Sequence, residues 1–407
     1  MELVALHKRV IGLDVHQAQI TACALIEEED GTTRIEQRQF GAFKRDRRAL
    51  AAWALALRPD EVVMESTGIY WKSPYAALES VGLRAKVVNA RHVKNVPGRK
   101  TDVGDAQWLA MLARAGLLRG SFIPPAKLRD LRLISRQRQK LVGQLASEKN
   151  RLHKVLTDSG VRLGVVVSDL HGQSARAMVK ALIAGKPPHD VLKLASHRLK
   201  ASREELFDAL QGDLTDSHQF VLNELLQHIE EIEARIGRFD AKLLGELIDE
   251  RNTLALLQTL PGVDLIGAAM LLVEIGTDME AFGSADRLAS WVGLCPGNHE
   301  SAGKRKSGHV RQGNRYVRRL LCEFAHAASR TQSVFKSKFQ ALVVRRGYKR
   351  SIVALGHKLL RTLYVMLKRR EPYRDSTTDY EALSVQRNAP RWIKALTKFG
   401  FLSQTTA

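Results

Sequence analysis

The order of apolar and amphipathic segments between residues 9 and 115 constrains the fold of this chain most strongly. Short apolar or alternating runs predict three consecutive strands, at RVIGLDVH, QITACALIE and TRIEQRQF. A helix, a strand, a helix, a strand and a helix are predicted next, at DRRALAAWALAL, DEVVMEST, YWKSPYAALESV, RAKVVNA and DVGDAQWLAMLARAG. Strands that alternate with helices in this way predict an α/β domain.

Three strands followed by helix, strand, helix, strand and helix is the element order of an RNase H-like domain. The chain then becomes helical, with one long amphipathic helix expected from Lys127 to about Ser159 and another from about Asp213 to Asp249. A GKPPHD turn lies between them. The two helices form either an antiparallel, coiled-coil hairpin that pairs with another subunit or a helical spacer within one subunit. The apolar face of the second helix is predicted at Val221, Leu225, Ile229, Ile232, Ile236 and Leu243.

The character of the sequence changes again from Thr259. TLPGVDLIGAAMLLVEIG places a Pro-Gly turn between apolar helical pieces, in the manner of a helix-hairpin-helix, whose loop amides can sit against a DNA phosphate. Helices are predicted over SADRLASWVGL, NRYVRRLLCEFAHAASR and SIVALGHKLLRTLYVMLKRR. The polar, Gly-rich segment CPGNHESAGKRKSGHVRQG between the first two is expected to be an exposed turn or hairpin. The last thirty or so residues give no clear signal.

Positive charge dominates the chain and indicates a polyanionic partner. Its 64 Lys and Arg outnumber 43 Asp and Glu, for a net charge of +21. From Lys304 to Arg370 there are 19 Lys or Arg and one acid, Glu323. A solvated surface normally mixes both signs, so this run indicates nucleic-acid binding.

Two further features bear on location and redox state. No apolar stretch reaches membrane-helix length, and MELVALHKRVIGLDV has neither an apolar signal core nor a cleavage site, so we expect no membrane partner. We expect a cytoplasmic protein of a prokaryote, associated with the nucleoid. Cys23, Cys295 and Cys322 are odd in number and lack metal-binding spacing, which predicts neither disulfides nor structural zinc.

Four acids lie where predicted elements begin or end. Asp14 and Glu65 close strands, whereas Asp102 and Asp105 open a helix on one face, three residues apart. Carboxylates at the ends of apolar strands are costly unless a cation or donor satisfies them, and oxygen ligands favour Mg²⁺ or Mn²⁺. Read singly, the helix pair could be a cap and a dipole partner, and the strand-end acids could be satisfied by lysines or amides. Together with the element order, the four predict a metal site.

Two polar residues adjoin the acids, His16 and Thr67. We expect His16 to support the site or lie at the surface rather than bind the ion.

The motifs GLDVH, VVMESTGIYW, KTDVGDAQWLA, LPGVDLIGAAMLLVEIG and LASWVGLCPGNHESAGKRKSGHVRQGNRYVRRLL occur in this order. Together they resemble the insertion-sequence one-ten family of transposases, which includes the pilin-gene inverting recombinase. The resemblance extends from about residue 10 to residue 370. It implies a domain like the Holliday-junction resolvase RuvC, with an Asp-Glu-Asp-Asp tetrad at Asp14, Glu65, Asp102 and Asp105. It also implies a coiled-coil region and a C-terminal transposase domain with a nucleophilic serine.

The resemblance divides the chain into four predicted parts. These are a RuvC-like catalytic domain over 1–120, a helical coiled-coil region over 121–252, a mainly α transposase domain over 253–375 and a tail over 376–407.

The same resemblance assigns the nucleophile to Ser301, because ESAGKRKSGH matches the family's pattern of Ser, Gly or Ala, Gly and Lys. Ser307 is the alternative in this segment, and a serine in a Gly-rich loop is otherwise usually a turn residue. The neighbouring cations are predicted to hold a scissile phosphate. Nucleic-acid contacts are predicted at Lys304, Arg305, Lys306, Arg311, Arg315, Arg318 and Arg319.

The sequence thus predicts a DNA transposase or recombinase in which Ser301 attacks a phosphodiester and Mg²⁺ or Mn²⁺ at the tetrad stabilises charge on the phosphoryl and leaving oxygens. The resemblance implies a homo-oligomer, a dimer or tetramer, that pairs the element's ends with a target DNA. It also implies a structured non-coding bridge RNA as guide, although composition does not separate RNA from DNA. One alternative is a resolvase-like, metal-dependent nuclease that uses water. Another is a binding or repressor protein that kept the fold without the chemistry.

Overall fold

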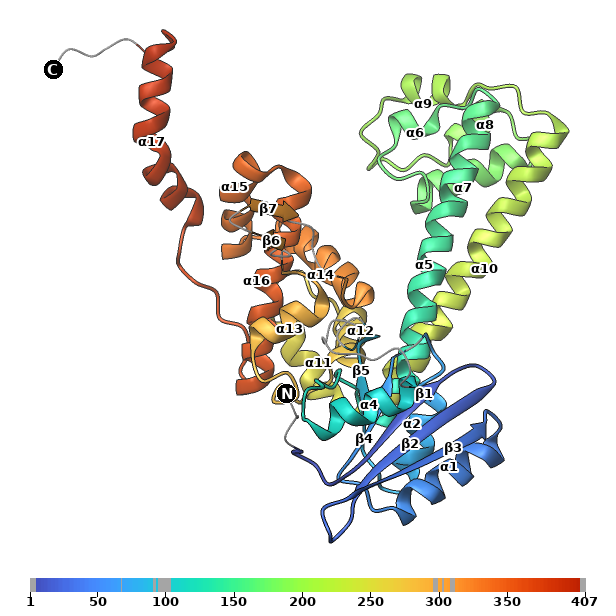
Figure 1. The fold of residues 1–407 in the computed structure, drawn as a ribbon. Coiled ribbons are helices and arrows are strands. Elements are labelled where there is room, and N and C mark those ends of the chain that lie inside the picture. Colours follow the sequence, from blue (N-terminus) through green and yellow to red (C-terminus); the bar gives the residue numbers. More distant parts are fainter. Residues whose placement is uncertain are drawn as a thin grey trace. The chain divides into compact units, whose positions relative to one another are not determined.

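The structure is a computed structural model in which the chain forms two compact units, residues 1–123 and 124–407 (Figure 1). Each unit is described by itself. The described residues are 5–402 apart from positions 67, 91–92, 94–103, 296–298, 302–303 and 308–311. For residues 299–301 and 304–307 only the backbone strands are described.

The first unit is built on a five-stranded mixed sheet of order β3-β2-β1-β4-β5. The antiparallel pairs are β1 with β2 and β2 with β3, whereas β1 with β4 and β4 with β5 are parallel. This topology confirms the predicted RNase H-like domain, and every strand falls within its predicted segment except that β3 extends one residue further, to Gly41. The strands are β1 (Arg9–Val15), β2 (Gln19–Glu27), β3 (Thr33–Gly41), β4 (Glu61–Glu65) and β5 (Ala85–Val88).

Helices cover both faces of this sheet because its central strands are apolar on both sides. On one face, Ile11 and Leu13 of β1 pack in a core that includes Leu50 of α1 (Lys44–Ala56) and Leu78 of α2 (Lys72–Ser80). On the other face, Val10 packs in a core formed with α4 (Asp105–Arg114). Successive residues of β1 therefore point to opposite cores.

The second unit begins with an arm made of two long helices, α5 (Ala126–Asp158) and α10 (Asp216–Glu246), which lie side by side in Figure 1. They are antiparallel, since Arg138 pairs with Asp240 while Lys149, further along α5, pairs with the earlier Glu233. The two predicted long helices are confirmed, and they pair within one chain. Four short helices cap the arm and were not predicted: α6 (Leu163–Val166), α7 (Gln173–Ile183), α8 (Pro188–Leu192) and α9 (Arg203–Leu210).

The predicted apolar face of α10 is correct in its middle and wrong at its start. Ile229 and Ile232 are buried as predicted, but Val221 is 40% exposed and Leu222 is buried in its place. The reason is that the first half of α10 packs against α7 of the cap as well as against α5, which turns its buried side by one residue. Periodicity within the helix does not show this additional neighbour.

The rest of the second unit is a helical body around α12, whose residues from Gly267 onward are all buried. Residues 259–264 connect α11 to α12, and Gly262 has φ +86° with its missing Cβ position 2.5 Å from the carbonyl oxygen of Phe324. The predicted Pro-Gly turn between two helices is confirmed, and packing within the chain explains its glycine. The helices here are η1 (Ile248–Glu250), α11 (Arg251–Gln258), α12 (Leu265–Ile275), α13 (Ala285–Val292), α14 (Arg315–Ala328), α15 (Val334–Arg346), α16 (Tyr348–Arg369) and α17 (Tyr380–Lys398).

The segment between α13 and α14 contains the predicted hairpin, formed by β6 (His299–Ser301) and β7 (Lys304–Ser307) in antiparallel register. Helices α15 and α17 were not predicted. Within the described part of the chain, no helix combines the length and the apolar character required to cross a membrane.

Candidate functional site

The sheet brings Asp14 and Glu65 together at one edge. Leu13 is in parallel register with Met64, so the next residue of each strand, Asp14 and Glu65, ends its strand beside the other. Residues in register on parallel strands project from the same face of a sheet. Both carboxyl groups therefore lie on one face, at the carboxyl ends of β1 and β4.

Helix α4, which starts at Asp105, begins near the same edge of the sheet. Its C-terminal Arg114 accepts a backbone hydrogen bond from Leu6, just before β1, so α4 runs antiparallel to β1 and begins near the strand's carboxyl end. The helix also lies on the face that carries the two acids, because Gly12, two residues before Asp14, faces it. A Cβ added to Gly12 would be 2.1 Å from the carbonyl oxygen of Ala106, the residue after Asp105. Only glycine allows the helix to approach so closely.

The sheet thus brings Asp14 and Glu65 to one edge, and α4 begins near that edge with Asp105, whereas Asp102 and Thr67 lie outside the described residues. His16 is more than half exposed, and its Nε2 lies 3.1 Å from Asp14 Oδ2. Among the residues that the structure describes, no group of three or more His, Cys, Asp or Glu side chains is arranged to hold a metal ion. The oxygen chemistry and the shared face of these acids fit Mg²⁺ or Mn²⁺.

A cavity of about 340 Å³ adjoins this edge. It is lined by His16 together with Arg47, Tyr70 and Lys72, three residues that the sequence analysis did not single out. Ile69, beside them, is 69% exposed. A signal was present in the sequence, since the run IYWK begins four residues after the strand-end acid Glu65 and its apolar residues belong to no strand.

The second unit carries the predicted serine. Ser301 ends β6 and is in register with Lys304 of β7, so it lies at the turn end of the hairpin. The rival Ser307 ends β7 and is in register with His299. Arg305 and Lys306 are also on β7, whereas Arg311 lies outside the described residues. The acids belong to the first unit and the hairpin to the second.

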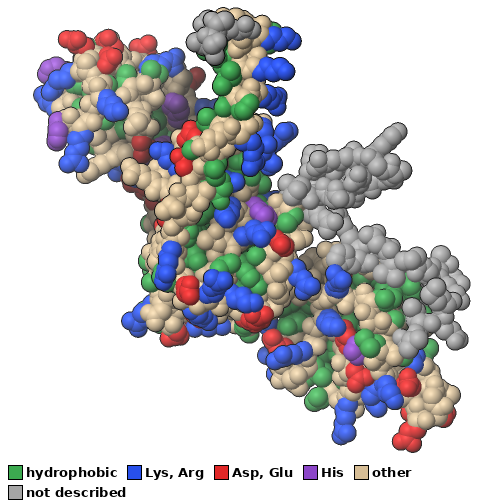
Figure 2. Space-filling view, turned by 90° about the vertical axis from the view of Figure 1, so that its left-hand side faces the viewer, with side chains coloured by type: hydrophobic (Ala, Val, Ile, Leu, Met, Phe, Trp, Pro, Cys, Tyr) green, Lys and Arg blue, Asp and Glu red, His purple; other side chains and the backbone are tan. Residues whose placement is uncertain are grey.

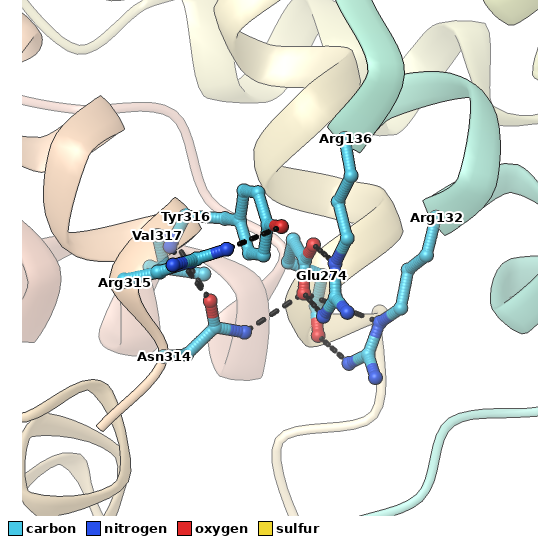
Figure 3. Close-up of polar contacts among 7 residues, drawn as sticks. All are labelled: Arg132, Arg136, Glu274, Asn314, Arg315, Tyr316 and Val317. Carbon is cyan, nitrogen blue, oxygen red and sulfur yellow. Dashed lines mark hydrogen bonds and ion pairs between the residues drawn. The ribbon is translucent and has the colours of Figure 1, made fainter. Parts of the chain in front are cut away.

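A buried carboxylate lies next to the segment that carries this hairpin (Figure 3). Glu274 of α12 is 0% exposed and accepts two hydrogen bonds from Arg136 of α5, at 2.7 and 3.0 Å. Arg132 of α5 lies 3.2 Å from the same carboxylate, and Asn314 Nδ2 donates to it at 2.8 Å. Sequence analysis missed Glu274, although it is the single charge in the helix LIGAAMLLVEI.

The charge state of this cluster follows from its contacts. Burial raises the pKa of Glu274, but the hydrogen bond from Arg136 and the positive charge of Arg132 outweigh it and hold the pKa below its ordinary value. Burial, reinforced by the charge of Arg136, lowers the pKa of Arg132 to about 10. At neutral pH the cluster therefore holds one carboxylate and two guanidinium groups.

Cations accumulate on α14 to α17. Of the predicted contacts on α14, Arg319 pairs with Glu323 at 3.0 Å, and the Arg315 guanidinium stacks 5.1 Å from the Tyr316 ring centroid. Arg318 is half-buried. Helix α17 has no buried residue and presents Lys and Arg side chains along one side and hydrophobic side chains along another (Figure 2).

Helices α15, α16 and α17 form a second basic cluster. Burial lowers the pKa of Lys338, and the charges of Lys358, Arg346, Arg345 and Arg387 lower it further. No carboxylate is among these influences. Positive groups that crowd one another in this way are suited to bind phosphates.

Comparisons with known proteins agree with this geometry. Residues 11–160 match a family model described as "Transposase", and residues 254–340 match one described as "Transposase IS116/IS110/IS902 family". The chain is 24% identical over 376 residues to the transposase for insertion sequence element IS1111A of Coxiella burnetii, covering 90% of this chain and 91% of that protein. It is 25% identical over 327 residues to a probable family 20 transposase of Pseudomonas aeruginosa, covering 78% and 87%.

Among solved structures, RuvC of Thermus thermophilus is similar over 28% of this chain and 99% of that chain, with 14% identity and a TM-score of 0.22. So low a score adds nothing to the argument from strand order.

The RNase H-like sheet with its acidic edge, joined to a helical unit that matches a second transposase model, defines a transposase, an enzyme that acts on DNA. More narrowly, the chain belongs to the IS110 family of transposases of insertion sequences.

Proposed function

We propose that this transposase cuts and rejoins DNA strands with Ser301 as nucleophile and a divalent metal at the acidic edge of the first unit. The observation that carries the proposal is the convergence of Asp14, Glu65 and the start of α4 on one face and one edge of the sheet. Carboxylate oxygens gathered at the ends of strands are the ligands that a divalent cation prefers. An acidic edge of this kind is typical of metal-dependent phosphoryl transfer.

Asp14, Glu65 and Asp105, with Asp102, would hold Mg²⁺ or Mn²⁺. When bound, such an ion stabilises negative charge on the oxygens of a reacting phosphate. His16 contributes by its hydrogen bond to Asp14, which fixes the orientation of that carboxyl group.

In the proposed reaction the Ser301 hydroxyl oxygen attacks the phosphorus of a DNA phosphodiester. An Oγ–P bond forms, the bond from phosphorus to one sugar oxygen breaks, and the serine proton is lost while the departing sugar oxygen gains one. The phosphoserine ester keeps the energy of the broken bond. Attack by the hydroxyl of a second strand then reverses the step and frees the serine.

Nucleic acid and further subunits are the proposed partners. The surplus positive charge on α14 to α17 supports contacts with phosphates of the element ends and the target, and equally with a structured guide RNA. The exposed apolar side of α17 and the paired arm helices support association of several copies, a dimer or tetramer in which an arm contributes a coiled coil. The acids of one copy would act with the serine of the same copy or of another.

The test is to incubate the full chain with end-labelled DNA, the guide RNA and Mg²⁺, then to denature it and look for protein-linked label. We expect a covalent adduct with the wild type, none with Ser301→Ala, and an undiminished adduct with the matched control Ser307→Ala. Asp14→Asn should abolish the adduct while the mobility shift with DNA persists.

Cleavage by the wild type without any adduct would instead favour a nuclease that uses water, since the acidic edge alone is sufficient for that reaction. Unchanged cleavage in Asp14→Asn would contradict both mechanisms.

A further inference from the structure

The segment 295–312, which carries Ser301, leaves the helical body and returns to it at one point. It leaves after α13, where Gly293 has φ +79°, and it returns at Gly313. A Cβ on Gly313 would lie 2.4 Å from the backbone nitrogen of Gly293 and from the carbonyl carbon of Val292. The two backbone strands therefore touch, and we call this contact the neck, Val292–Gly293 against Gly313–Asn314.

Asn314 holds the neck closed through both its backbone and its side chain. Its backbone N–H donates to the carbonyl of Trp291 at 3.1 Å, which joins the returning strand to the departing one. Its side-chain oxygen accepts hydrogen bonds from the amides of Tyr316 and Val317 at 3.0 and 3.2 Å and so caps α14. Its side-chain nitrogen is then committed to Glu274 (Figure 3).

Glu274 ties this residue to the interior. Its carboxylate is held by Arg132 and Arg136 of α5, so a single carboxylate joins α5, α12 and the cap of α14. A buried ion pair is a poor source of stability, because apolar side chains of similar volume often do as well. An apolar side chain at position 274, however, could not accept the hydrogen bond from the Asn314 side chain.

We propose that Glu274 is a positioning residue for the serine-bearing segment: through Asn314 it fixes the neck, and thereby the place from which Ser301 is presented to DNA. The inference rests on the proposed role of Ser301. It predicts that disturbing the link between Glu274 and Asn314 slows the chemical step while DNA binding persists, because the groups that contact phosphate remain.

The link is tested by two substitutions of the donor, Asn314. Asn314→Asp keeps the cap on α14 but sets two carboxylates against each other. Asn314→Ser keeps an oxygen that caps α14 but removes the amide that donates to Glu274, without adding a charge. We expect N314D to lower the single-turnover rate of adduct formation by roughly 10- to 100-fold, as for a reacting group displaced by about 1 Å. We expect N314S, which removes the hydrogen bond without setting two carboxylates against each other, to lower that rate in the same direction but less.

Hydrogen exchange gives a readout that does not depend on chemistry. The amides of peptides covering 291–317 should exchange faster in N314D than in the wild type, and to a smaller extent faster in N314S. Gly313→Ala forces the neck apart sterically while it leaves the Glu274 hydrogen bond chemically intact. It should produce the same two effects.

Glu233→Gln is the matched control. Like Glu274, Glu233 is held by two cations, Arg176 at 2.7 and 2.9 Å and Lys149 at 2.9 Å, but it lies in the arm. At a temperature where every variant is folded, E233Q should form the adduct at the wild-type rate and exchange normally over 291–317.

Two results would overturn the inference: a wild-type rate and normal exchange in N314D, or a wild-type rate and normal exchange in N314S. Failure of the proposed function looks different, because the wild type itself would then form no adduct. In that case, unchanged exchange over 291–317 in N314D and G313A would also contradict the inference that Glu274 and Asn314 fix the neck.

Discussion

Gly12 controls how closely the start of α4 approaches the acids, and Gly12→Ala tests this directly. The added Cβ would meet the carbonyl oxygen of Ala106 at 2.1 Å and the amide nitrogen of Ala110 at 2.6 Å. Both atoms are backbone, so no side chain can rotate away. To reach an ordinary contact of 3.4 Å, α4 must retreat by about 1.3 Å, or the sheet must give way by as much.

Two effects of this substitution can be separated. Overpacking of a well-packed interface costs about 1–3 kcal/mol, and a clash with backbone belongs at the upper end of that range. A displacement of about 1 Å at a catalytic group costs about 100-fold in rate, and Asp105 moves with α4. We therefore expect G12A to lose both stability and metal-dependent cleavage, with cleavage reduced even at temperatures where the first unit is fully folded.

The assays are urea unfolding followed by far-UV circular dichroism and single-turnover cleavage of end-labelled DNA with saturating Mg²⁺. The matched control is Gly104→Ala, at the cap of the same helix, where a Cβ would meet nothing within 4 Å. It should lose about 0.5–1 kcal/mol, because alanine caps a helix less well than glycine, and little activity. A G12A protein as stable and as active as G104A would refute the argument that contact between β1 and α4 sets the site.

Further predictions concern charge and reactivity. Glu65→Gln should lower metal-dependent cleavage about 1000-fold, measured in single turnover, with DNA affinity in a gel-shift assay retained. The hydrogen bond from Arg176 lowers the pKa of Glu233 to about 2, below its ordinary 4.5. Its stabilisation is therefore present above pH 4.5 and is lost as the pH falls toward 2, about 1 kcal/mol after allowance for solvent, so E233Q should flatten the dependence of the urea midpoint between pH 6 and pH 3. Burial raises the pKa of Cys23 to about 11, so iodoacetamide at pH 8 should label Cys295 well before Cys23, as followed by peptide mass spectrometry.

The strands and long helices could be predicted because burial leaves a regular trace in them. β2, buried on both faces, is apolar almost throughout, and α5 keeps leucines at helical spacing. The short helices α6 to α9 carry too few turns for a period to emerge. Helix α15 has apolar residues on several sides, so it shows no clear one-sided pattern. Helix α17 does have an apolar side, but it contains Pro390, which in a sequence argues against a helix.

The acids of the site could be predicted because carboxylates that end apolar strands conflict with their surroundings. The closeness of α4 could not, since Gly12 in GLDVH gives no sign of which helix it faces. The Glu274 cluster depends on contacts between α5, α12 and Asn314 that are far apart in sequence. Only the charge at position 274 stands out in the sequence, and the sequence does not show which residues contact it.

The neck also has a consequence for how such chains diversify. The backbone on both sides of segment 295–312 is anchored at adjacent points of the helical body. The segment can therefore be replaced as a unit, a cassette, while the helices on either side stay as they are. Once the ends of a loop are held together, each doubling of its length costs only about 0.6 kcal/mol. Evolution can therefore lengthen, shorten or replace this cassette without repacking α13 or α14, and a protein engineer can graft another cassette at the same two glycines.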